Sequence, residues 1–296
     1  MIEQVIEARR RDLGGFEVGR LLPYGQRPMI GPFIFFDHMG PVDFPPGVPR
    51  STDVRPHPHI GLATVTYLFA GEITHRDSLG FEQAIRPGEV NWMTAGRGIS
   101  HSERFDGMRR DGGSFDGIQA WVALPDADEE TDPGFAHVDA GDLPVIDIGD
   151  AGVRLIAGSA FGLTSSVETR SPMFYAHASL PAGADVGVPD GYSERAVYVA
   201  RGRLDLGGCA YGPGNMVVLR RDTDPVLTAL EASIVMLLGG EPVGPRHIWW
   251  NFVSSSAARI EQAKADWQAG RIPLPVGDSD EFIPLPDGSP PPEPMS

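Results

Sequence analysis

The sequence predicts an all-β fold of two tandem β-barrels followed by one helix near the C-terminus. Three observations predict it: a size of two domains, a composition rich in turn-forming residues, and a repeated strand pattern. The chain has 296 residues, about twice the size of a common domain. Its 37 glycines and 28 prolines indicate many turns between short elements, while 41% hydrophobic and 22% charged residues are ordinary for a globular protein.

The first half of the chain has the pattern of short strands. From Val5 to Leu124, apolar runs such as FIFFDHMG, LATVTYLFAGEI and QAWVALP alternate with Gly and Pro and show no helical period. The segment PDADEETDPGFAHVDAGDLP that follows is acidic and contains Pro and Gly, which is typical of a linker. We therefore expect an N-terminal domain over residues 1–130 and a C-terminal domain over residues 131–296.

A second block of strands and turns, from Pro144 to about Pro242, repeats features of the first. Two segments of the first block have an echo in the second, namely VTYLFAGEI (65–73) in AVYVARGRL (196–204) and RPGEV (86–90) in GPGNM (212–216). The first echo matches Tyr67 with Tyr198. A repeated strand pattern of this length predicts a tandem duplication of one barrel.

One amphipathic helix is expected after the second block. The segment SSSAARIEQAKADWQAGR (254–271) offers a serine as N-cap and has Gly270 near its C-terminal end. Ile260, Ala263 and Trp267 fall at helical spacing, so we expect them to pack against a barrel rather than to bind a ligand. The final residues, PLPDGSPPPEPMS, are polar and rich in proline, which predicts an extended or disordered tail.

Charge and composition exclude several classes of partner. Lys and Arg number 24 against 40 Asp and Glu, a formal charge of −16, and no stretch is basic enough to follow a nucleic acid or an anionic membrane. The N-terminus lacks the apolar run of a signal peptide and no window could span a membrane, so we expect a soluble, cytoplasmic protein. The single cysteine, Cys209, fits a reducing compartment, and we expect it to be a small buried hydrophobe.

Two histidines two residues apart form the first half of a candidate metal site. In an extended strand, His57 and His59 project to the same side. The positions that continue this period beyond His59 begin small and become apolar, as the inside of a narrow barrel requires. Pro56 and Pro58 remove backbone donors on either side of His57, which places this stretch at a strand end or a sheet edge.

The segment RGISHSERF supplies the second half of the site. His101 and Glu103 share a strand face with Ile99 and Phe105, so both polar side chains are expected to point into the barrel. Burying a glutamate and a histidine there is costly unless they are paired or bind a cation. One divalent ion held by His57, His59, His101 and Glu103 removes this cost for both segments. The remaining histidines, for which we expect no metal role, are His38, His75, His137, His177 and His247.

Three segments resemble the pirin family of the cupin superfamily, and the resemblance covers most of the chain. They are FDHMGP (36–41), RPHPHIGLATVTYLFAGEITHRDSLG (55–80) and RPGEVNWMTAGRGISHSE (86–103). The resemblance implies a bicupin, two jelly-roll-like cupin barrels of which only the N-terminal one holds metal, usually iron. The ligands it implies are three histidines and one glutamate, which match His57, His59, His101 and Glu103.

Two further positions bear on this resemblance. Cupins in general place a metal-binding glutamate where this chain has Ala63, and its absence there is itself similar to pirins. When Tyr198 is aligned with Tyr67, Val188 and Asp190 stand opposite His57 and His59. We therefore expect the C-terminal domain to be a degenerate cupin without metal.

The donor set and the resemblance leave two functions open besides a structural metalloprotein without turnover, against which the open coordination positions of a four-ligand ion argue. Three imidazoles and one carboxylate suit Fe(II), and also Mn, Ni, Co, Cu or Zn, with iron the choice that the resemblance implies. The favoured hypothesis is a pirin-like dioxygenase of the quercetin 2,3-dioxygenase type that uses O2 and a flavonol, with Glu103 as proton acceptor and all four ligands as catalytic residues. The alternative is a non-enzymatic, redox-responsive iron regulator that acts through a protein partner. Neither requires direct binding to nucleic acid or to a membrane.

Overall fold

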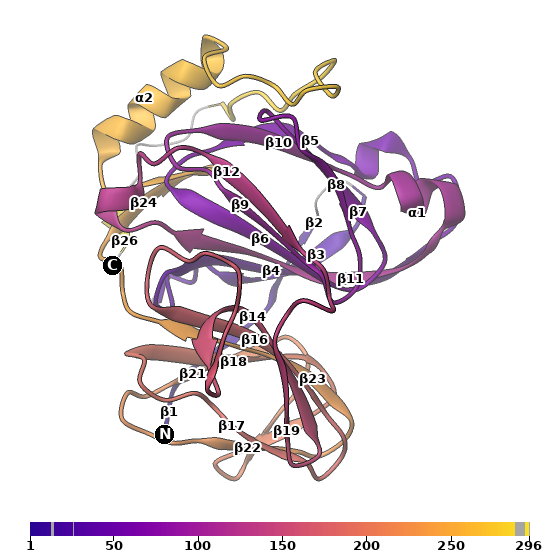
Figure 1. Ribbon diagram of the computed structural model, residues 1–296, viewed down its shortest axis with the longest axis vertical. Helices are drawn as coiled ribbons and strands as arrows, with labels where there is room; N and C mark the ends of the chain where they lie inside the picture. Colours follow the sequence, from indigo (N-terminus) through magenta and orange to yellow (C-terminus); the bar gives the residue numbers. More distant parts are fainter. Residues whose placement is uncertain (13–14, 26, 288–293, 296) are drawn as a thin grey trace. The chain divides into compact units, whose positions relative to one another are not determined.

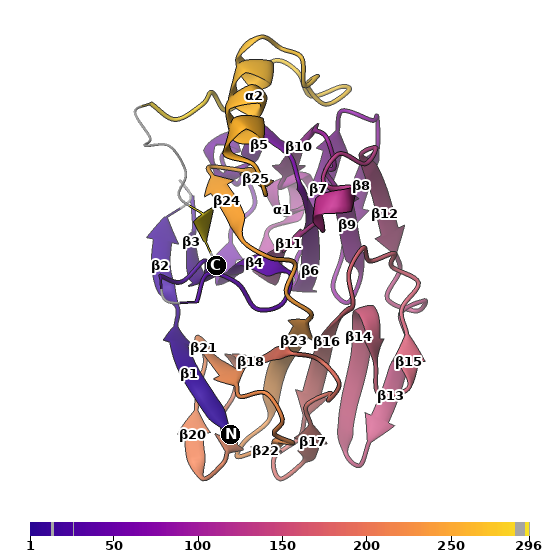
Figure 2. The same cartoon turned by 90° about the vertical axis from the view of Figure 1, so that its left-hand side faces the viewer.

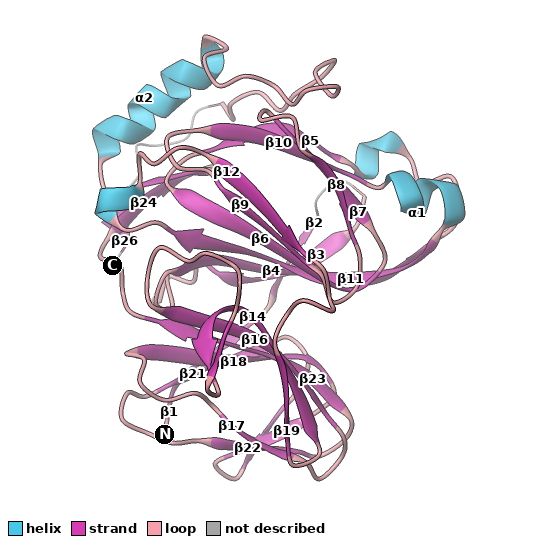
Figure 3. Cartoon of the chain, viewed as in Figure 1, coloured by secondary structure: helices cyan, strands magenta, loops and turns pink. Residues whose placement is uncertain are grey.

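The computed structural model describes residues 1–12, 15–25, 27–287 and 294–295. Strands dominate this part of the chain, and the two α-helices described are α1 (Asp106–Asp111) and α2 (Ala257–Gln268) (Figure 3). Two short 3-10 turns, at Arg50–Thr52 and Asp126–Asp128, complete the helical segments of the described residues. Neither α-helix is long and apolar enough to cross a membrane.

The chain divides into two compact units that interleave along the sequence. The unit we call the first barrel comprises residues 11–18, 39–137 and 243–296, and the second barrel comprises residues 1–10, 19–38 and 138–242. These boundaries fall in different places from the single cut expected after residue 130. The division into domains 1–130 and 131–296 therefore stays a prediction.

The first barrel is built on two antiparallel sheets (Figure 1). Four strands form one sheet, in the order β5 (Val54–His59), β10 (Ile99–Arg104), β7 (Ile73–Asp77), β8 (Glu82–Ile85). The other has the order β12 (Gly134–Val138), β9 (Val90–Thr94), β6 (Leu62–Ala70), β11 (Gly113–Ala123), β4 (Phe33–Phe44), β3 (Glu17–Leu22), β2 (Arg9–Asp12). The boundaries of the two units fall inside β2, β3 and β4.

The second barrel also has two sheets, and its N-terminal strand β1 (Ile2–Glu7) lies along β21 (Figure 2). The larger sheet continues from β1 in the order β21 (Asn215–Leu219), β18 (Glu194–Arg201), β23 (Ser233–Gly240), β16 (Met173–Leu180), β14 (Ala151–Ala160), β13 (Val145–Ile148), and β15 (Leu163–Thr164) pairs with β14. The smaller one has the order β17 (Asp185–Gly187), β22 (Val226–Ala229), β19 (Leu204–Leu206), β20 (Cys209–Tyr211).

The strand orders of the two barrels match, which supports the predicted duplication. The series β9, β6, β11, β4 corresponds to β21, β18, β23, β16, and β5, β10, β7, β8 corresponds to β17, β22, β19, β20. Tyr67 and Tyr198 lie in the corresponding strands β6 and β18, and both are buried. Gly71 and Gly202 follow these strands with φ of 87° and 78°, a conformation that favours glycine. The all-β prediction with two cupin-like barrels is confirmed.

The C-terminal helix is confirmed, with shorter bounds than the 254–271 expected. Ile260, Ala263 and Trp267 are buried and pack on β24 (Arg246–Trp249) and β25 (Phe252–Ser254). Ser256 occupies the N-cap position but its side chain makes no capping hydrogen bond. Gly270 has a φ of 66° just after the helix.

One expectation about the ends of elements is corrected. Cys209 was expected to be buried, but it is exposed because it begins the edge strand β20 directly after a two-glycine turn. The tail was expected to be extended or disordered, and its residues Pro294–Met295 are extended, since they form the short strand β26 that pairs with β24. The expectation for residues 288–293 and 296 lies outside the described residues.

Candidate metal centre

The edge strand β5 and its neighbour β10 bring the two halves of the candidate site together. The antiparallel register pairs His101 with His57 and Ile99 with His59. β5 is the outer strand of its sheet, as the prolines around His57 predict, because a proline has no N–H to donate to a further strand. The strand ends at His59, and Gly61, with a φ of 67°, turns the chain into β6 of the other sheet.

Three imidazoles converge at this place. The ring centroids of His57, His59 and His101 lie 4.4–5.0 Å apart, and one nitrogen from each ring falls in a group whose members are within 4.8 Å of one another. The residues are 7%, 1% and 1% exposed. The prediction that the HxH and HxE segments share an inward face is therefore confirmed for the three histidines.

The hydrogen bonds of these rings leave one nitrogen of each free for a ligand. His57 donates from Nδ1 to the carbonyl of Arg55 at 2.9 Å, and His59 donates from Nδ1 to the carbonyl of Asn251 at 3.2 Å. These bonds select the tautomer with a lone pair on Nε2, which is the arrangement of a metal-ligating histidine. Nε2 of His101 is buried and has no hydrogen-bond partner among the described residues.

A fourth histidine, His75, supports His101 and was missed in the sequence. Nδ1 of His101 lies 3.3 Å from Nδ1 of His75, and Nε2 of His75 lies 2.9 Å from the carboxylate of Asp77. The other carboxylate oxygen of Asp77 accepts the N–H groups of Leu79 and Phe81. His75 is not among the converging ligand nitrogens, so the expectation that it has no metal role stays a prediction; the register of β7 with β10 nevertheless places it beside the ligand strand.

With an ionised Asp77, one arrangement of protons gives each of the two contacts, Asp77–His75 and His75–His101, one donor and one acceptor. An Asp77 carboxylate accepts the proton of His75 Nε2, which leaves Nδ1 of His75 as an acceptor for the N–H of His101. His101 then presents its Nε2 lone pair to the centre. The ring of Phe135 stacks on His75 at a centroid distance of 4.4 Å and an interplanar angle of 14°, which fixes the plane of that imidazole.

Burial keeps the three converging imidazoles neutral. Desolvation lowers the pKa of His57 to about 4 and holds the pKa values of His59 and His101 well below the usual range, with a smaller contribution from the neighbouring imidazoles. Neutral imidazole is the form that binds a metal ion. Protons therefore compete little with a metal at these three positions near neutral pH.

Glu103 lies on the same strand but outside the tight group. Its carboxylate is not among the ligand atoms within 4.8 Å of one another, and a bulge between His101 and Glu103 shifts the pairing with β5. The residue is 9% exposed and accepts no hydrogen bond from the described residues. Desolvation raises the pKa of its carboxyl to about 7. Its role as fourth ligand stays a prediction.

The opposite face of β10 is held by the segment that follows α2 (Figure 1). The hydroxyl of Ser102 and the guanidinium of Arg104 donate to the carboxylate of Asp278 at 2.6–2.7 Å. Burial alone would raise the pKa of Asp278, but these hydrogen bonds outweigh it and lower the pKa. Arg104 also contacts Asp53 at 3.4 Å. This network holds β10, the strand of His101 and Glu103, on the face opposite the candidate metal site.

The residues present fit a divalent metal ion. Three neutral nitrogen donors converge, the Nε2 atom of His101 has no protein partner, and an unpaired buried carboxylate lies two residues away. A buried polar atom without a partner is costly, and a bound cation removes this cost for the imidazoles and the carboxylate together. The group formed by His57, His59 and His101 can thus bind a metal.

Comparison with known families decides the class of the chain. Residues 15–122 match the family model described as Pirin, and residues 175–273 match the Pirin C-terminal cupin domain. The chain belongs to the pirin family. The resemblance of its sequence segments is therefore confirmed.

Several pirin relatives are similar over nearly the whole chain. A pirin-like protein of Caulobacter vibrioides is 59% identical over 97% of this chain and 100% of its own length. A putative quercetin 2,3-dioxygenase of Pseudomonas aeruginosa is 37% identical over 90% of this chain and 84% of its own length. The crystal structure of a quercetin 2,3-dioxygenase from Acinetobacter baumannii superposes with a TM-score of 0.85 at 35% identity, covering 97% of this chain and 96% of that one.

Proposed function

We propose that this pirin is a metal-dependent dioxygenase that oxidises flavonols of the quercetin type, with iron bound by His57, His59, His101 and Glu103. The convergence of three neutral imidazoles beside the unpaired carboxylate of Glu103 is the observation that carries the proposal. The relatives named as quercetin 2,3-dioxygenases supply the choice of substrate class. Three imidazoles and one carboxylate suit iron among the divalent ions.

When bound, the metal supplies Lewis-acid and redox chemistry toward the flavonol and O2. The protein's own residues supply the rest. His57 and His59 are held by backbone carbonyls and His101 by His75, so three ligand positions are fixed before the substrate arrives. The indole ring of Trp121 lies 5.2 Å from His59 and gives the surroundings of the site an apolar face.

Glu103 is proposed to take the hydroxyl proton of the flavonol at its carboxylate. Burial raises the pKa of Glu103 to about 7 in the metal-free protein, so this carboxylate has a higher affinity for a proton than an exposed one. Loss of that proton leaves the flavonol as an electron-rich enolate, which is the form that reacts with O2. The same carboxylate serves as metal ligand and as proton acceptor.

Oxygen uptake with a panel of flavonols tests the proposal. Separate preparations reconstituted with Fe, Mn, Ni, Co, Cu or Zn are compared with the same concentration of the free ion, with activity normalised to bound metal. We expect quercetin-dependent uptake with at least one metal, loss of uptake in His57→Ala, and full activity in the control His177→Ala, a histidine of the second barrel. If no preparation exceeds the free ion, the dioxygenase proposal fails and the iron-dependent regulator becomes the favoured function.

A further inference from the structure

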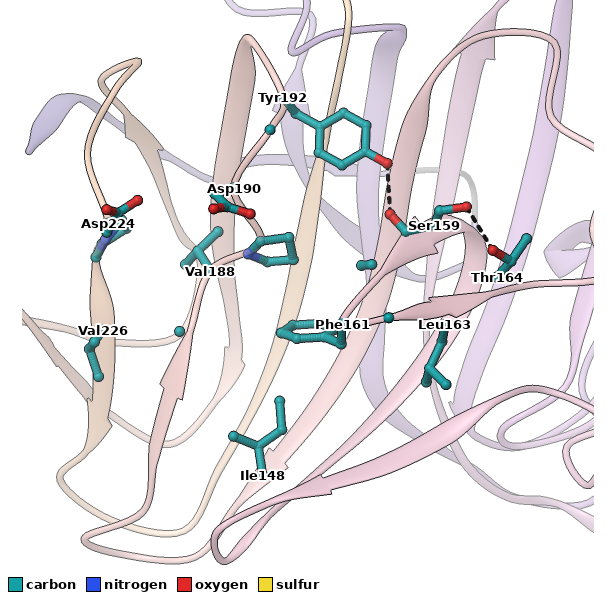
Figure 4. A pocket seen from close by; sticks show the side chains of 16 residues that line it. Ile148, Ser159, Phe161, Leu163, Thr164, Val188, Asp190, Tyr192, Asp224 and Val226 are labelled. Carbon is teal, nitrogen blue, oxygen red and sulfur yellow. Dashed lines mark hydrogen bonds between the residues drawn. The ribbon is translucent and has the colours of Figure 1, made fainter.

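The second barrel contains a cavity of about 920 Å³. Its lining comes from the hairpin of β14 and β15, the loop between β17 and β18, and the start of β22 (Figure 4). Buried apolar residues line part of it, namely Ala160, Val188, Pro189 and Pro225, while Asp190 and Asp224 are exposed. A volume of this size and a mainly apolar wall are typical of small-molecule sites in barrel mouths.

The cavity occupies the place that corresponds to the metal centre of the first barrel. The match of Tyr67 with Tyr198 puts Val188 and Asp190 at the positions of His57 and His59. Strand register agrees, because His101 pairs with His57 in the first barrel, while the N–H of Val188 donates to the carbonyl of Pro225 in the second. In the second copy, two lining residues of the cavity, Val188 and Asp190, therefore stand where the first copy has two of its metal donors.

The hairpin turn between β14 and β15 carries Phe161 at a position where glycine or asparagine is usual. Pairing of Ser159 with Thr164 and of Ala160 with Leu163 leaves Phe161 and Gly162 as a two-residue turn, with φ of 56° and 74°. Such a turn favours Asn-Gly, and a phenylalanine at positive φ is strained. The ring of Phe161 packs against the hydrophobic core of the second barrel and lies in the middle of the cavity (Figure 4). The strained turn thus presents an aromatic side chain to the cavity.

The polar groups of the cavity indicate the charge of its ligand. Asp190 and Asp224 lie together at one side of it (Figure 4), and neither forms an ion pair with a described residue. No Lys, Arg or His is among the lining residues. The adjoining recess is lined by both aspartates and also by Asp222, Glu241, Arg195 and Arg221. The guanidinium of Arg195 is held by the carbonyls of Pro189, Arg220 and Thr223, and Arg221 interacts with the carboxylate of Glu241. Four carboxylates against two guanidinium groups leave this side of the cavity with a net negative charge for a ligand.

Tyr192 is a second aromatic residue of the lining, and in Figure 4 it lies above Phe161, on the same side as Asp190. The hydroxyl of Tyr192 donates to the carbonyl of Ser159 at 2.7 Å, which anchors its side chain to the strand that leads into the turn. Two aromatic rings next to two carboxylates suit an organic cation, since rings attract a cation at their faces and the carboxylates neutralise it.

We propose that the second barrel binds a small organic amine, with its ammonium group at Asp190 and Asp224 and its aromatic or aliphatic body against Phe161. An anion would be repelled by the two carboxylates, and a neutral molecule would gain no attraction from their charge. The site is separate from the metal centre, so it does not depend on flavonol oxidation in the first barrel.

Calorimetric titration of the full-length, metal-loaded protein tests this with three indoles of similar shape and different charge. Tryptamine is the cation, tryptophol the neutral analogue and indole-3-acetate the anion. We expect one saturable tryptamine site per chain, tryptophol at least about tenfold weaker, and no binding of indole-3-acetate. Equal affinity for the cation and the anion overturns the proposal, as does the absence of tryptamine binding.

Variants locate the site. Asp190→Asn with Asp224→Asn should weaken tryptamine binding at least tenfold, while the exposed control Asp185→Asn should leave it unchanged. Phe161→Asn should also weaken binding at least tenfold, and because asparagine suits the turn and offsets part of the packing lost with the ring, the variant should stay folded, as its unfolding midpoint will show. The His57→Ala, His101→Ala variant should bind tryptamine as the wild type does. Unchanged binding in the aspartate double variant, or loss of binding in the histidine double variant, contradicts the proposal.

Discussion

Nδ1 of His101 lies 3.3 Å from Nδ1 of His75, and this contact links a candidate metal ligand to the buried carboxylate of Asp77. The contact joins His101 of β10 to His75 and Asp77 of β7 and fixes the orientation of these three side chains. It sets the tautomer of His101 in the same way that backbone carbonyls set those of His57 and His59. The difference is that a side-chain relay can be altered by substitution, while a backbone carbonyl cannot.

Replacing Asp77 with asparagine should therefore weaken metal binding. The amide keeps an oxygen for the N–H groups of Leu79 and Phe81 but presents an NH2 group to Nε2 of His75. His75 must then carry its proton on Nδ1, where it opposes the N–H of His101. We expect a loss of about 10–100-fold in metal affinity, measured by competition with a chelator. His177→Gln is the control, since His177 lies in the second barrel and belongs to no group of converging metal ligands among the described residues. Equal affinities in Asp77→Asn and wild type would show that the relay has no effect on the site.

Metal affinity should depend on pH through Glu103. Burial raises the pKa of this carboxyl to about 7, and the metal binds the deprotonated form. Below pH 7 protons compete for the carboxylate, so the apparent affinity should fall up to about tenfold per pH unit, and above pH 7 it should level off. The histidines add little to this slope above pH 5, because the pKa of His57 is about 4 and those of His59 and His101 are also depressed. Chelator competition between pH 5.5 and 8 measures the slope, and Glu103→Gln should remove it. A slope that persists in that variant would assign the titration to another group.

Glu103→Gln should also separate metal binding from turnover. Glutamine keeps an oxygen that can ligate but cannot accept the flavonol proton. Oxygen uptake with quercetin, corrected for bound metal, should fall by about 10²–10⁴-fold, the range typical of losing a general base. Glu168→Gln, an exposed glutamate of the second barrel, is the matched control. Unchanged turnover per bound metal would exclude Glu103 as the base.

The contact of β10 with the C-terminal segment should contribute to stability. Asp278→Ala removes three hydrogen bonds and leaves the guanidinium of Arg104, which is 3% exposed, without its main partner. We expect a loss of about 2–4 kcal/mol in the unfolding of the first barrel, measured in urea on the metal-free protein. The exposed neighbour Asp280 provides the control variant. A change no larger than that of Asp280→Ala would mean that the network does not stabilise the ligand strand.

The metal-binding segments could be found in the sequence because their information is local. Residues two apart in a strand share a face, so HxH and HxE fix the direction of His57, His59 and His101 without knowledge of their partners. The duplicated strand pattern could be found for the same reason, since it recurs as a continuous stretch. The expected face does not continue along one strand beyond His59. The strand ends there, and Gly61 turns the chain into β6 of the other sheet.

The support around the site could not be predicted in this way. His75 and His101 are 26 residues apart, and their contact depends on the register of β7 with β10, which no local pattern specifies. Asp278 reaches Ser102 and Arg104 from an irregular segment, 174–176 residues along the chain, where there is no periodicity to read. The exposure of Cys209 depends likewise on its place at a sheet edge.

Anaerobic equilibrium dialysis with Fe(II), followed by elemental analysis, tests the proposed centre most directly. We expect one tightly bound ion per chain in the wild type, and loss of that ion in the His57→Ala, His101→Ala variant. The second barrel should add none, since Val188, Asp190 and Pro225 stand at the positions of the first barrel's histidines. Two tightly bound ions per chain, or undiminished binding in the double variant, would contradict the assignment of a single metal centre to His57, His59, His101 and Glu103.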